Sequence, residues 1–172
     1  MRAIWLALSL MLAGCGSSPT AVRVVAQEGY VLSFPASPET AIGRDGPVRY
    51  RIDAIRAFDA RFESAWFRFT ELDASERADL LTRVERGLMS PGAHLESRVQ
   101  ARTDNIERVD LIIDHADGRR GYHRIYYPSA TTMLQVSVVG PKGEGWEQFV
   151  SPFFGSLKLE GSFAEPPTSA SL

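Results

Sequence analysis

The chain contains only one cysteine, Cys15, in 172 residues, so no disulfide can form within it. Dense basic runs are missing as well: the only lysines are Lys142 and Lys158, and the formal net charge is −2. A nucleic-acid-binding surface is therefore not expected. No run of roughly 18 consecutive apolar residues occurs, which argues against a transmembrane helix. With 44% hydrophobic and 23% charged residues, the composition is that of a globular protein.

The sequence also lacks the short motifs of the common enzyme classes. It contains no G-x-S-x-G elbow, no H-E-x-x-H motif, no P-loop and no CxxC pair. A nucleophile, a base and an orienting acid cannot be assembled from the spacing of the candidate residues. We therefore expect a protein that is not an enzyme and that needs no cofactor.

The amino-terminal residues have the layout of a secretory signal peptide. Met1 and Arg2 precede an apolar run over residues 3–12, and a membrane-spanning helix needs about 20 residues, so this run is too short to be one. The letters LAGC follow at residues 12–15. A buried or disulfide-bonded role for Cys15 is disfavoured, because there is no second cysteine and the position lies close to the terminus.

Leu12-Ala13-Gly14-Cys15 resemble a bacterial lipobox. The resemblance implies cleavage before Cys15, a diacylglyceryl group on its thiol and a mature protein tethered to a membrane. Gly16 stands where an inner-membrane lipoprotein commonly has aspartate, which resembles outer-membrane sorting. The expected partner at this end is thus the membrane, through a covalent lipid on Cys15, with the protein facing the periplasm.

Composition divides the chain into four expected segments. Residues 1–14 are the signal peptide, and residues 15–22 are a lipidated tether of small and polar residues. Residues 23–160 are one α+β domain, and residues 161–172 are a disordered tail.

The pattern between residues 30 and 159 is mainly that of β-strands. Apolar and polar residues alternate in several stretches, and turn residues separate them, at residues 43–47, 59–60, 104–105 and 117–118. Strands are expected at residues 30–34, 48–58, 61–72, 95–101, 109–115, 122–127, 132–139 and 156–159.

Helical spacing replaces this alternation in two places. An apolar stripe between residues 80 and 88 predicts an amphipathic helix with Ser75 as its N-cap. Trp146, Phe149 and Val150 predict a short helix that cannot continue unbroken past Pro152. The expected fold class is α+β, with a mainly antiparallel sheet of about six or seven strands and two to three flanking helices.

The order of these elements resembles that of PsbP-like domains, the fold shared with DcrB-type bacterial lipoproteins. The segments that carry the resemblance are YVLSFPASPE from residue 30, MLQVSVVGP at residues 133–141 and WEQFVSPFFGSLKL at residues 146–159. In the last segment Leu157 replaces the family's usual aromatic residue. The resemblance implies an antiparallel sheet with helices packed on its faces. It brings no common set of catalytic residues, because members are mostly accessory or binding proteins.

Two histidines are the only candidates for a metal site. A hairpin with a loop at residues 117–120 would place His115 opposite His123 on one face, where Asp114 or Asp117 could add an oxygen ligand. A shift of the loop by one residue would instead turn His123 to the other face. Without a third fixed ligand, we expect these residues to be polar side chains at a solvated hairpin tip and expect no metal.

Two aspartates, Asp110 and Asp114, alternate with apolar residues on one strand. Paired carboxylates of this kind can act in acid–base chemistry when they converge in a cleft. We expect them instead to be solvated or paired with Arg108 and Arg124.

Adjacent tyrosines offer a candidate contact surface. Tyr126 and Tyr127 point to opposite faces of their strand, so at least one is expected to be exposed. An exposed tyrosine beside Arg120 and Arg124 has the composition of a protein-contact site.

The sequence thus predicts a lipid-anchored, non-enzymatic cell-envelope protein whose domain binds another envelope protein or component. The alternative is a small-ligand or metal-binding periplasmic domain, or a minor hydrolase, that uses His115 and His123.

Overall fold

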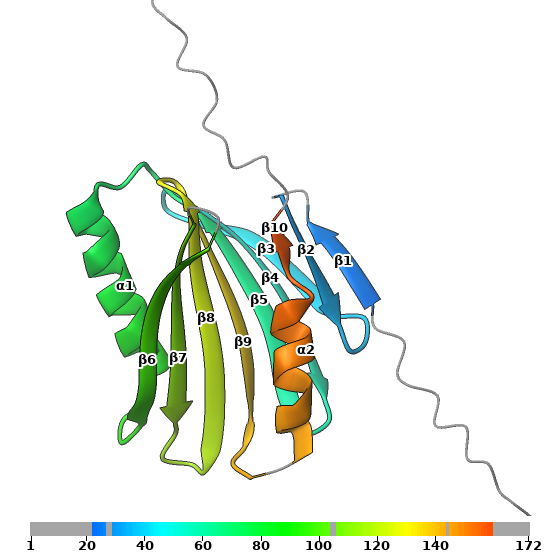
Figure 1. The fold of residues 1–172 in the computed structure, drawn as a ribbon. Coiled ribbons are helices and arrows are strands. Elements are labelled where there is room, and N and C mark those ends of the chain that lie inside the picture. The colour runs from blue at the N-terminus through cyan, green and yellow to red at the C-terminus, as the bar shows by residue number, and fades with distance from the viewer. Residues whose placement is uncertain (1–21, 27–28, 104–105, 144, 160–172) are drawn as a thin grey trace, which may run out of the picture.

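The computed structural model describes residues 22–26, 29–103, 106–143 and 145–159, and their strands form two antiparallel sheets (Figure 1). The large sheet has seven strands in the order β3-β4-β5-β9-β8-β7-β6, and the small sheet has three in the order β1-β2-β10. The strands are β1 (Val22–Ala26), β2 (Tyr30–Phe34), β3 (Glu39–Asp45), β4 (Val48–Ala57), β5 (Ala60–Arg68), β6 (His94–Thr103), β7 (Ile106–Asp114), β8 (Arg119–Ser129), β9 (Thr132–Pro141) and β10 (Lys158–Leu159).

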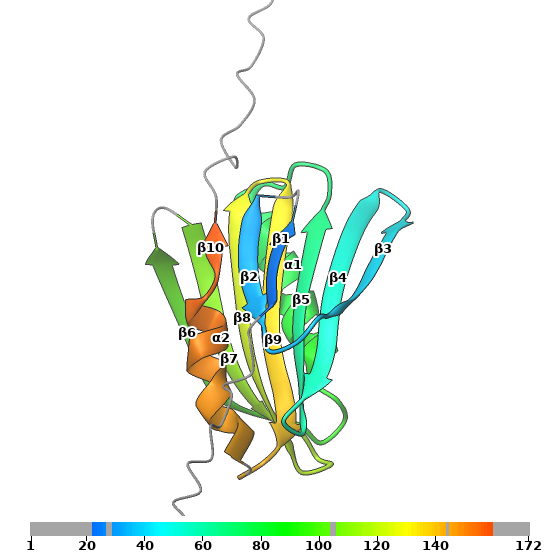
Figure 2. The same ribbon diagram turned by 90° about the vertical axis from the view of Figure 1, so that its right-hand side faces the viewer.

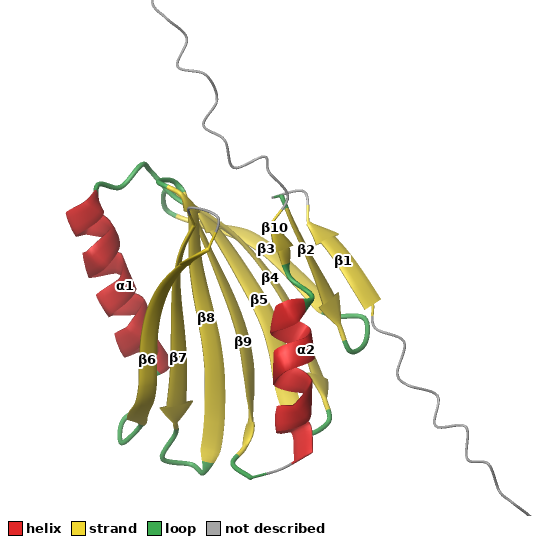
Figure 3. Ribbon diagram, viewed as in Figure 1, coloured by secondary structure: helices red, strands yellow, loops and turns green. Residues whose placement is uncertain are grey.

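Two helical segments lie on opposite sides of the large sheet (Figures 2 and 3). They are α1 (Ala74–Leu88) and a turn of 3₁₀-helix, η1 (Gly145–Phe149), that continues into α2 (Val150–Gly155). The expected α+β class, with an antiparallel sheet and flanking helices, is confirmed. Among the described residues, no helix has the length and apolar character that crossing a membrane requires.

The side of the large sheet covered by α1, called here the α1 face, carries one apolar core. Its fully buried residues include Leu111 and Ile113 of β7 and Ile125 of β8. Leu81 and Val84 of α1 pack against this group, which confirms the apolar stripe expected for the helix.

The opposite side, the α2 face, carries the second core. Phe153 of α2 lies between the two sheets, with its ring centroid 5.3 Å from that of Phe34 in β2 and 5.2 Å from that of Phe62 in β5. The small sheet and α2 therefore cover β5 and β9 together, and burial of each such aromatic ring contributes about 1.5–3 kcal/mol. Tyr126 of β8 also enters this core, whereas other residues of β6, β7 and β8 on the same face line a groove beside α2.

A buried polar network also joins the two sheets. Asp53 of β4 is fully buried and accepts hydrogen bonds from Arg51, at 2.8 and 3.1 Å, and from the Thr40 hydroxyl. The hydroxyl of Tyr30 in β2 lies 3.4 Å from the Asp53 carboxylate and 3.2 Å from the Ser64 hydroxyl. Nothing in the sequence pattern predicted this network.

The tight turn between β4 and β5 confirms the expected hairpin. Its two residues, Phe58 and Asp59, both have positive φ, at 52° and 63°. Two successive positive φ values match the twist of the flanking strands. The Phe58 ring stacks on Phe149 of η1, with ring centroids 4.1 Å apart, so the hairpin tip is held against the helical segment.

The helix termini differ from the expectations. The N-cap of α1 is Asp73, which accepts from the Glu76 backbone while the Glu76 carboxylate accepts from the Asp73 backbone, each at 2.9 Å. Ser75, the expected N-cap, lies inside the helix. The second helical segment, which was expected not to continue unbroken past Pro152, changes from 3₁₀-helix to α-helix at residues 149–150 and then runs to Gly155. Pro152 is accommodated because it lies in the first turn of α2, where a backbone N–H has no intrahelical partner.

Two strands were not expected. β3 replaces part of the turn expected at residues 43–47, and most of its side chains are exposed, so it lacks an apolar alternation. β1 begins at Val22 and pairs with β2, whose other edge pairs with β10. The strand expected at residues 30–34 is present with the same ends, and the other expected strands are present with shifted ends. The turn expected at residues 104–105 lies outside the described residues.

Candidate functional site: a groove on the α2 face

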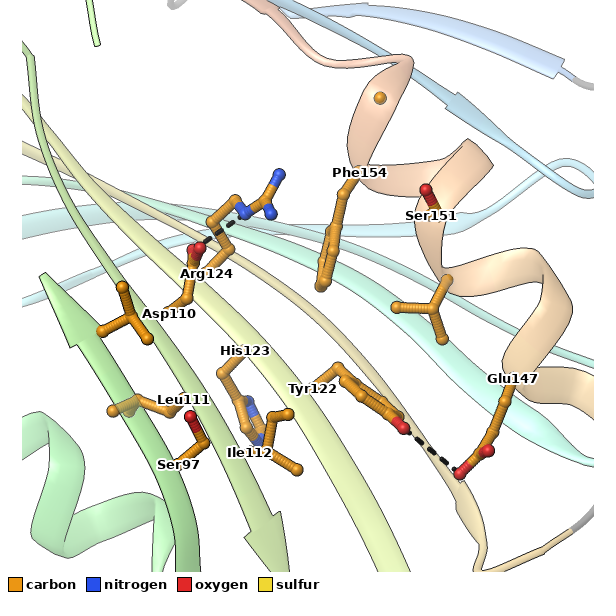
Figure 4. Close-up of a pocket in the computed structure, with 13 residues that line it drawn as sticks. Ser97, Asp110, Leu111, Ile112, Tyr122, His123, Arg124, Glu147, Ser151 and Phe154 are labelled. Atoms are coloured by element: carbon orange, nitrogen blue, oxygen red, sulfur yellow. Dashed lines mark hydrogen bonds and ion pairs between the residues drawn. The ribbon is translucent and has the colours of Figure 1, made fainter. Parts of the chain in front are cut away.

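A groove of about 560 Å³ lies between α2 and the β6–β8 part of the large sheet (Figure 4). It exists because α2 covers β5 and β9 and stands beside the neighbouring strands. The residues lining it are Ser97, Val99, Asp110, Leu111, Ile112, Tyr122, His123, Arg124, Glu147, Val150, Ser151, Phe154 and Gly155.

The middle of the groove is apolar. Ile112 of β7 and Tyr122 of β8 are directly opposite one another on its floor, and Val150 and Phe154 of α2 form a wall. The Tyr122 hydroxyl donates to Glu147 of η1 at 3.2 Å. Partial burial raises the pKa of Tyr122, so the phenol keeps its proton at neutral pH.

One end of the groove is charged. Asp110 and Arg124 are directly opposite on β7 and β8, and Arg124 Nε donates to Asp110 Oδ1 at 2.8 Å. Arg108 Nη2 lies 3.2 Å from the other Asp110 oxygen, and its Nε is buried without a hydrogen-bond partner. The Arg124 guanidinium also lies 4.8 Å from the centre of the Phe154 ring. Arg108 is not among the residues that line the groove, but it shares Asp110 with Arg124, so two guanidinium groups face one carboxylate beside this end of the groove.

A second ion-paired group stands further along the same two strands. Arg120 donates to Asp114 through Nε at 2.7 Å and Nη2 at 3.0 Å, and Lys142 Nζ donates to the same carboxylate at 2.7 Å. The bonds from Arg120 and Lys142 hold the pKa of Asp114 well below its usual range. The expected pairing of the two aspartates with arginines is thus confirmed, although Asp114 pairs with Arg120 and Lys142, and Arg120 does not line the groove.

The adjacent tyrosines Tyr126 and Tyr127 do not form an exposed contact surface. Tyr126 and Tyr127 do point to opposite faces, because Tyr126 packs in the core of the α2 face and Tyr127 in that of the α1 face. Each is only 7% exposed, however, so the expectation of an exposed tyrosine is wrong. Both faces of β8 are packed in a core at this level, a long-range effect that the sequence of one strand cannot reveal. Of the four residues expected to make a protein contact, only Arg124 lines the groove.

His115 and His123 lie on the same face but not opposite one another. His123 pairs with Leu111 across β7 and β8, whereas the backbone N–H of His115 donates to Arg119 at the hairpin turn. Both rings belong to the α1 face, above Gly121 of β8. Burial lowers the pKa of His123 to about 4, with a smaller contribution from His115.

The described residues hold no arrangement typical of a hydrolase. Ser90 Oγ lies 3.4 Å from His115 Nδ1, a long contact, and His115 Nε2 has no hydrogen-bond partner. A triad needs a base that is oriented by an acid, whereas the hydrogen-bond contact of the His115 ring is to the Ser90 hydroxyl. Within the same residues, no group of three or more His, Cys, Asp or Glu side chains could hold a metal ion. Cys15 and the lipobox lie outside the described residues.

Sequence patterns missed most of the groove. The spacing of Trp146, Phe149 and Val150 predicted the helical segment but not which strands it covers. Glu147 and Phe154 therefore could not be assigned to a site with Tyr122. Phe153 and Phe154, which are adjacent in α2, both belong to the core of the α2 face, and Phe154 also lines the groove.

Comparisons with known proteins support the fold and nothing finer. No family model matches the chain, and no curated protein does. Among solved structures, the chain is similar to the solution structure of cyanobacterial PsbP (CyanoP) from Synechocystis sp. PCC 6803, with a TM-score of 0.60 and 14% sequence identity. The similarity covers 86% of this chain and 98% of that one. The chain therefore has a PsbP-like fold, as its sequence indicated.

Proposed function

We propose that this protein is a lipid-anchored lipoprotein of the bacterial cell envelope, and that its periplasm-facing domain is a binding module rather than an enzyme. The occupant of its groove is an extended segment of another envelope protein. The observation that carries this proposal is the groove beside α2, which combines an apolar middle with a positively charged end.

The edge position of β6 favours an extended chain as the occupant. β6 is the last strand of the large sheet, and its one sheet neighbour among the described strands is β7. A further strand can add to such an edge through main-chain hydrogen bonds, while its alternate side chains enter neighbouring pockets. Val99, on the groove side of β6, is 52% exposed and can contact such a segment.

The charges suggest which side chain the segment carries. Arg108 and Arg124 share Asp110 at one end of the groove, so an acidic side chain arriving there would balance the second guanidinium. The middle of the groove, with Ile112 and Phe154, would take an apolar side chain of the same segment.

The anchor in this proposal rests on the amino-terminal sequence. The LAGC letters at residues 12–15 close an apolar run, and Cys15 is the only thiol. Each buried CH₂ of an acyl chain contributes about 0.8 kcal/mol, so two or three chains hold a protein durably at a membrane. Gly16 favours the outer membrane as the location.

Site-specific photo-crosslinking of the full lipidated chain in its own host tests the groove. A photo-reactive residue at Val99 should give a discrete adduct with an envelope protein, and Arg124→Met in the same chain should diminish that adduct. Ile42 is the matched control position, because it is 73% exposed on β3, the opposite edge of the same sheet. No adduct at Val99, or the same adducts at both positions, would contradict the proposed site.

Cys15→Ser tests the anchor separately. The variant should lack the acyl chains and should accumulate as a soluble or uncleaved precursor, while its circular dichroism spectrum stays that of the unchanged protein. An acylated, membrane-bound Cys15→Ser protein would show that the lipobox interpretation is wrong.

A further inference from the structure

The rings of His115 and His123 lie on the α1 face, and three of their nitrogen atoms are buried without a hydrogen-bond partner. His123 is only 4% exposed. His115 Nε2 and both ring nitrogens of His123 are buried and have no hydrogen-bond partner. Buried polar atoms in folded proteins are nearly always paired, so three unpaired nitrogens in two neighbouring residues call for an explanation.

Gly121 shows that the two rings converge on one point. A Cβ atom at Gly121 would lie 3.2 Å from His115 Nε2 and would overlap His123 Nε2. Both Nε2 atoms therefore lie close to the same small region above the backbone of β8. Glycine inside a strand weakens it and often marks a place where another group must approach the backbone. Here the approaching groups are the two imidazole rings.

The surroundings restrict which ligand this region can take. The neighbouring residues of the α1 face, Leu111 and Ile113, are almost completely buried and apolar. Zn²⁺ in proteins takes three or four ligands, often with negative charge, and the described residues offer no such group. A divalent ion held by two neutral rings in apolar surroundings would leave both charges without compensation.

We propose that His115 and His123 form a two-coordinate site for Cu(I), with their Nε2 atoms as the two ligands. A monovalent d¹⁰ ion accepts two nitrogen donors in a linear arrangement and brings a single charge. Imidazole is a ligand that copper readily takes. His123 also stands among the residues that line the groove, but its pairing with Leu111 and its position above Gly121 place the two rings on the α1 face, the side of the sheet opposite to α2.

Two further features suit the rings to this role. Ser90 Oγ lies 3.4 Å from His115 Nδ1, so the nitrogen that is not a ligand faces a hydroxyl that can orient the ring. Metal binding needs neutral imidazole, and burial keeps His123 neutral down to acidic pH.

Anaerobic titration with Cu(I), in competition with a chromophoric Cu(I) chelator, tests the site. The full chain should carry Cys15→Ser, so that its only thiol does not bind the ion. One equivalent of Cu(I) should bind. His115→Ala should weaken binding by about 100-fold or more, because loss of even a supporting partner of a ligand costs about 10- to 100-fold. His115 lies at the hairpin turn and is half-buried, so we expect this variant to fold.

His94 provides the matched control. Its side chain is 75% exposed beside Glu96, so His94→Ala should leave Cu(I) affinity unchanged. Gly121→Ala keeps both histidines but fills the point where they meet, and it should weaken binding while circular dichroism shows the fold retained. The proposal is overturned if the folded protein binds no stoichiometric Cu(I), or if His115→Ala and Gly121→Ala bind it as tightly as the parent chain.

Discussion

Arg124 on β8 links the sheet floor of the groove to its helical wall: its Nε donates to Asp110 on β7 at 2.8 Å, and its guanidinium lies 4.8 Å from the ring centre of Phe154 on α2. Asp110 and Arg124 are direct cross-strand partners, so the sheet fixes the base of the arginine side chain. The Phe154 contact then ties α2 to the charged end of the groove. One residue thus helps to set both the width and the charge of the candidate site.

Arg124→Met should lower the free energy of unfolding by about 1–2 kcal/mol, because it removes a charge-assisted hydrogen bond and a cation–π contact. Both members of the pair are largely buried, with 25% and 27% of their side chains exposed. Urea denaturation measures the change. Arg61→Met is the control, because Arg61 pairs with Glu63 at an exposed site, 47% exposed, where a pair contributes about 0–1 kcal/mol. Equal effects of the two substitutions would contradict a special role for Arg124.

Gly140→Ala should displace the buried indole of Trp146. A Cβ atom at Gly140 would lie 2.6 Å from Trp146 Cε2, and the indole Nε1 donates to the Pro141 carbonyl at 2.6 Å. Overpacking of this kind costs about 1–3 kcal/mol. Thermal unfolding and the tryptophan emission spectrum measure the loss of stability and the exposure of the indole. At Gly87 of α1 an added Cβ meets nothing within 4 Å, so Gly87→Ala should leave stability unchanged or raised. A Gly140→Ala protein as stable as the parent would show that Trp146 can move freely.

Strands with an alternating apolar pattern could be predicted from the sequence, because one of their faces enters a core. Thr132–Pro141 (β9) is the clearest example, with a central position in the large sheet. β3 could not be predicted this way, since most of its side chains are exposed and its edge position demands no apolar face. The N-cap at Asp73 could have been predicted from the sequence, because Glu76 stands three residues later and completes the capping box.

The site was harder to predict than the fold, because it depends on which strands α2 leaves uncovered. Alternation assigned Tyr126 and Tyr127 to opposite faces but could not show that both faces are covered at that level. The offset between His115 and His123 depends on the hairpin register, which the sequence left open. Whether the two rings share a face depends on the same register, and their convergence above Gly121 required the three-dimensional arrangement.

Asp53→Ala should destabilise the protein by about 3–5 kcal/mol, because it removes one partner of a buried ion pair. Asp53 is fully buried and accepts from Arg51, whose side chain is 16% exposed, and from Thr40. Asp53 also lies 3.4 Å from the Tyr30 hydroxyl, so the substitution should loosen the small sheet from the large one.

Urea denaturation measures the change, with hydrogen exchange of β2 amides as the local readout. Asp45→Ala, at an exposed position of β3, is the control. A loss below about 1 kcal/mol, typical of an exposed pair, would contradict a structural role for the network.

His123 should make the protein less stable as the pH falls from about 6.5 to about 4. Its pKa is lowered from 6.5 to about 4 in the folded state by burial, and less by His115. Above pH 6.5 the ring is neutral in both states and has no effect on the pH dependence. Between the two values the unfolded chain binds a proton that the folded chain does not. The free energy of unfolding therefore falls by up to about 1.4 kcal/mol per pH unit, and the loss levels off below pH 4. The lowered pKa of Asp114 acts mainly around and below its ordinary value of 3.8, at the acidic end of this window and beyond it. Urea denaturation at successive pH values should show the slope in the parent chain and in His94→Leu, whose ring is exposed, but not in His123→Leu. A slope that persists in His123→Leu would assign the acid sensitivity to another group.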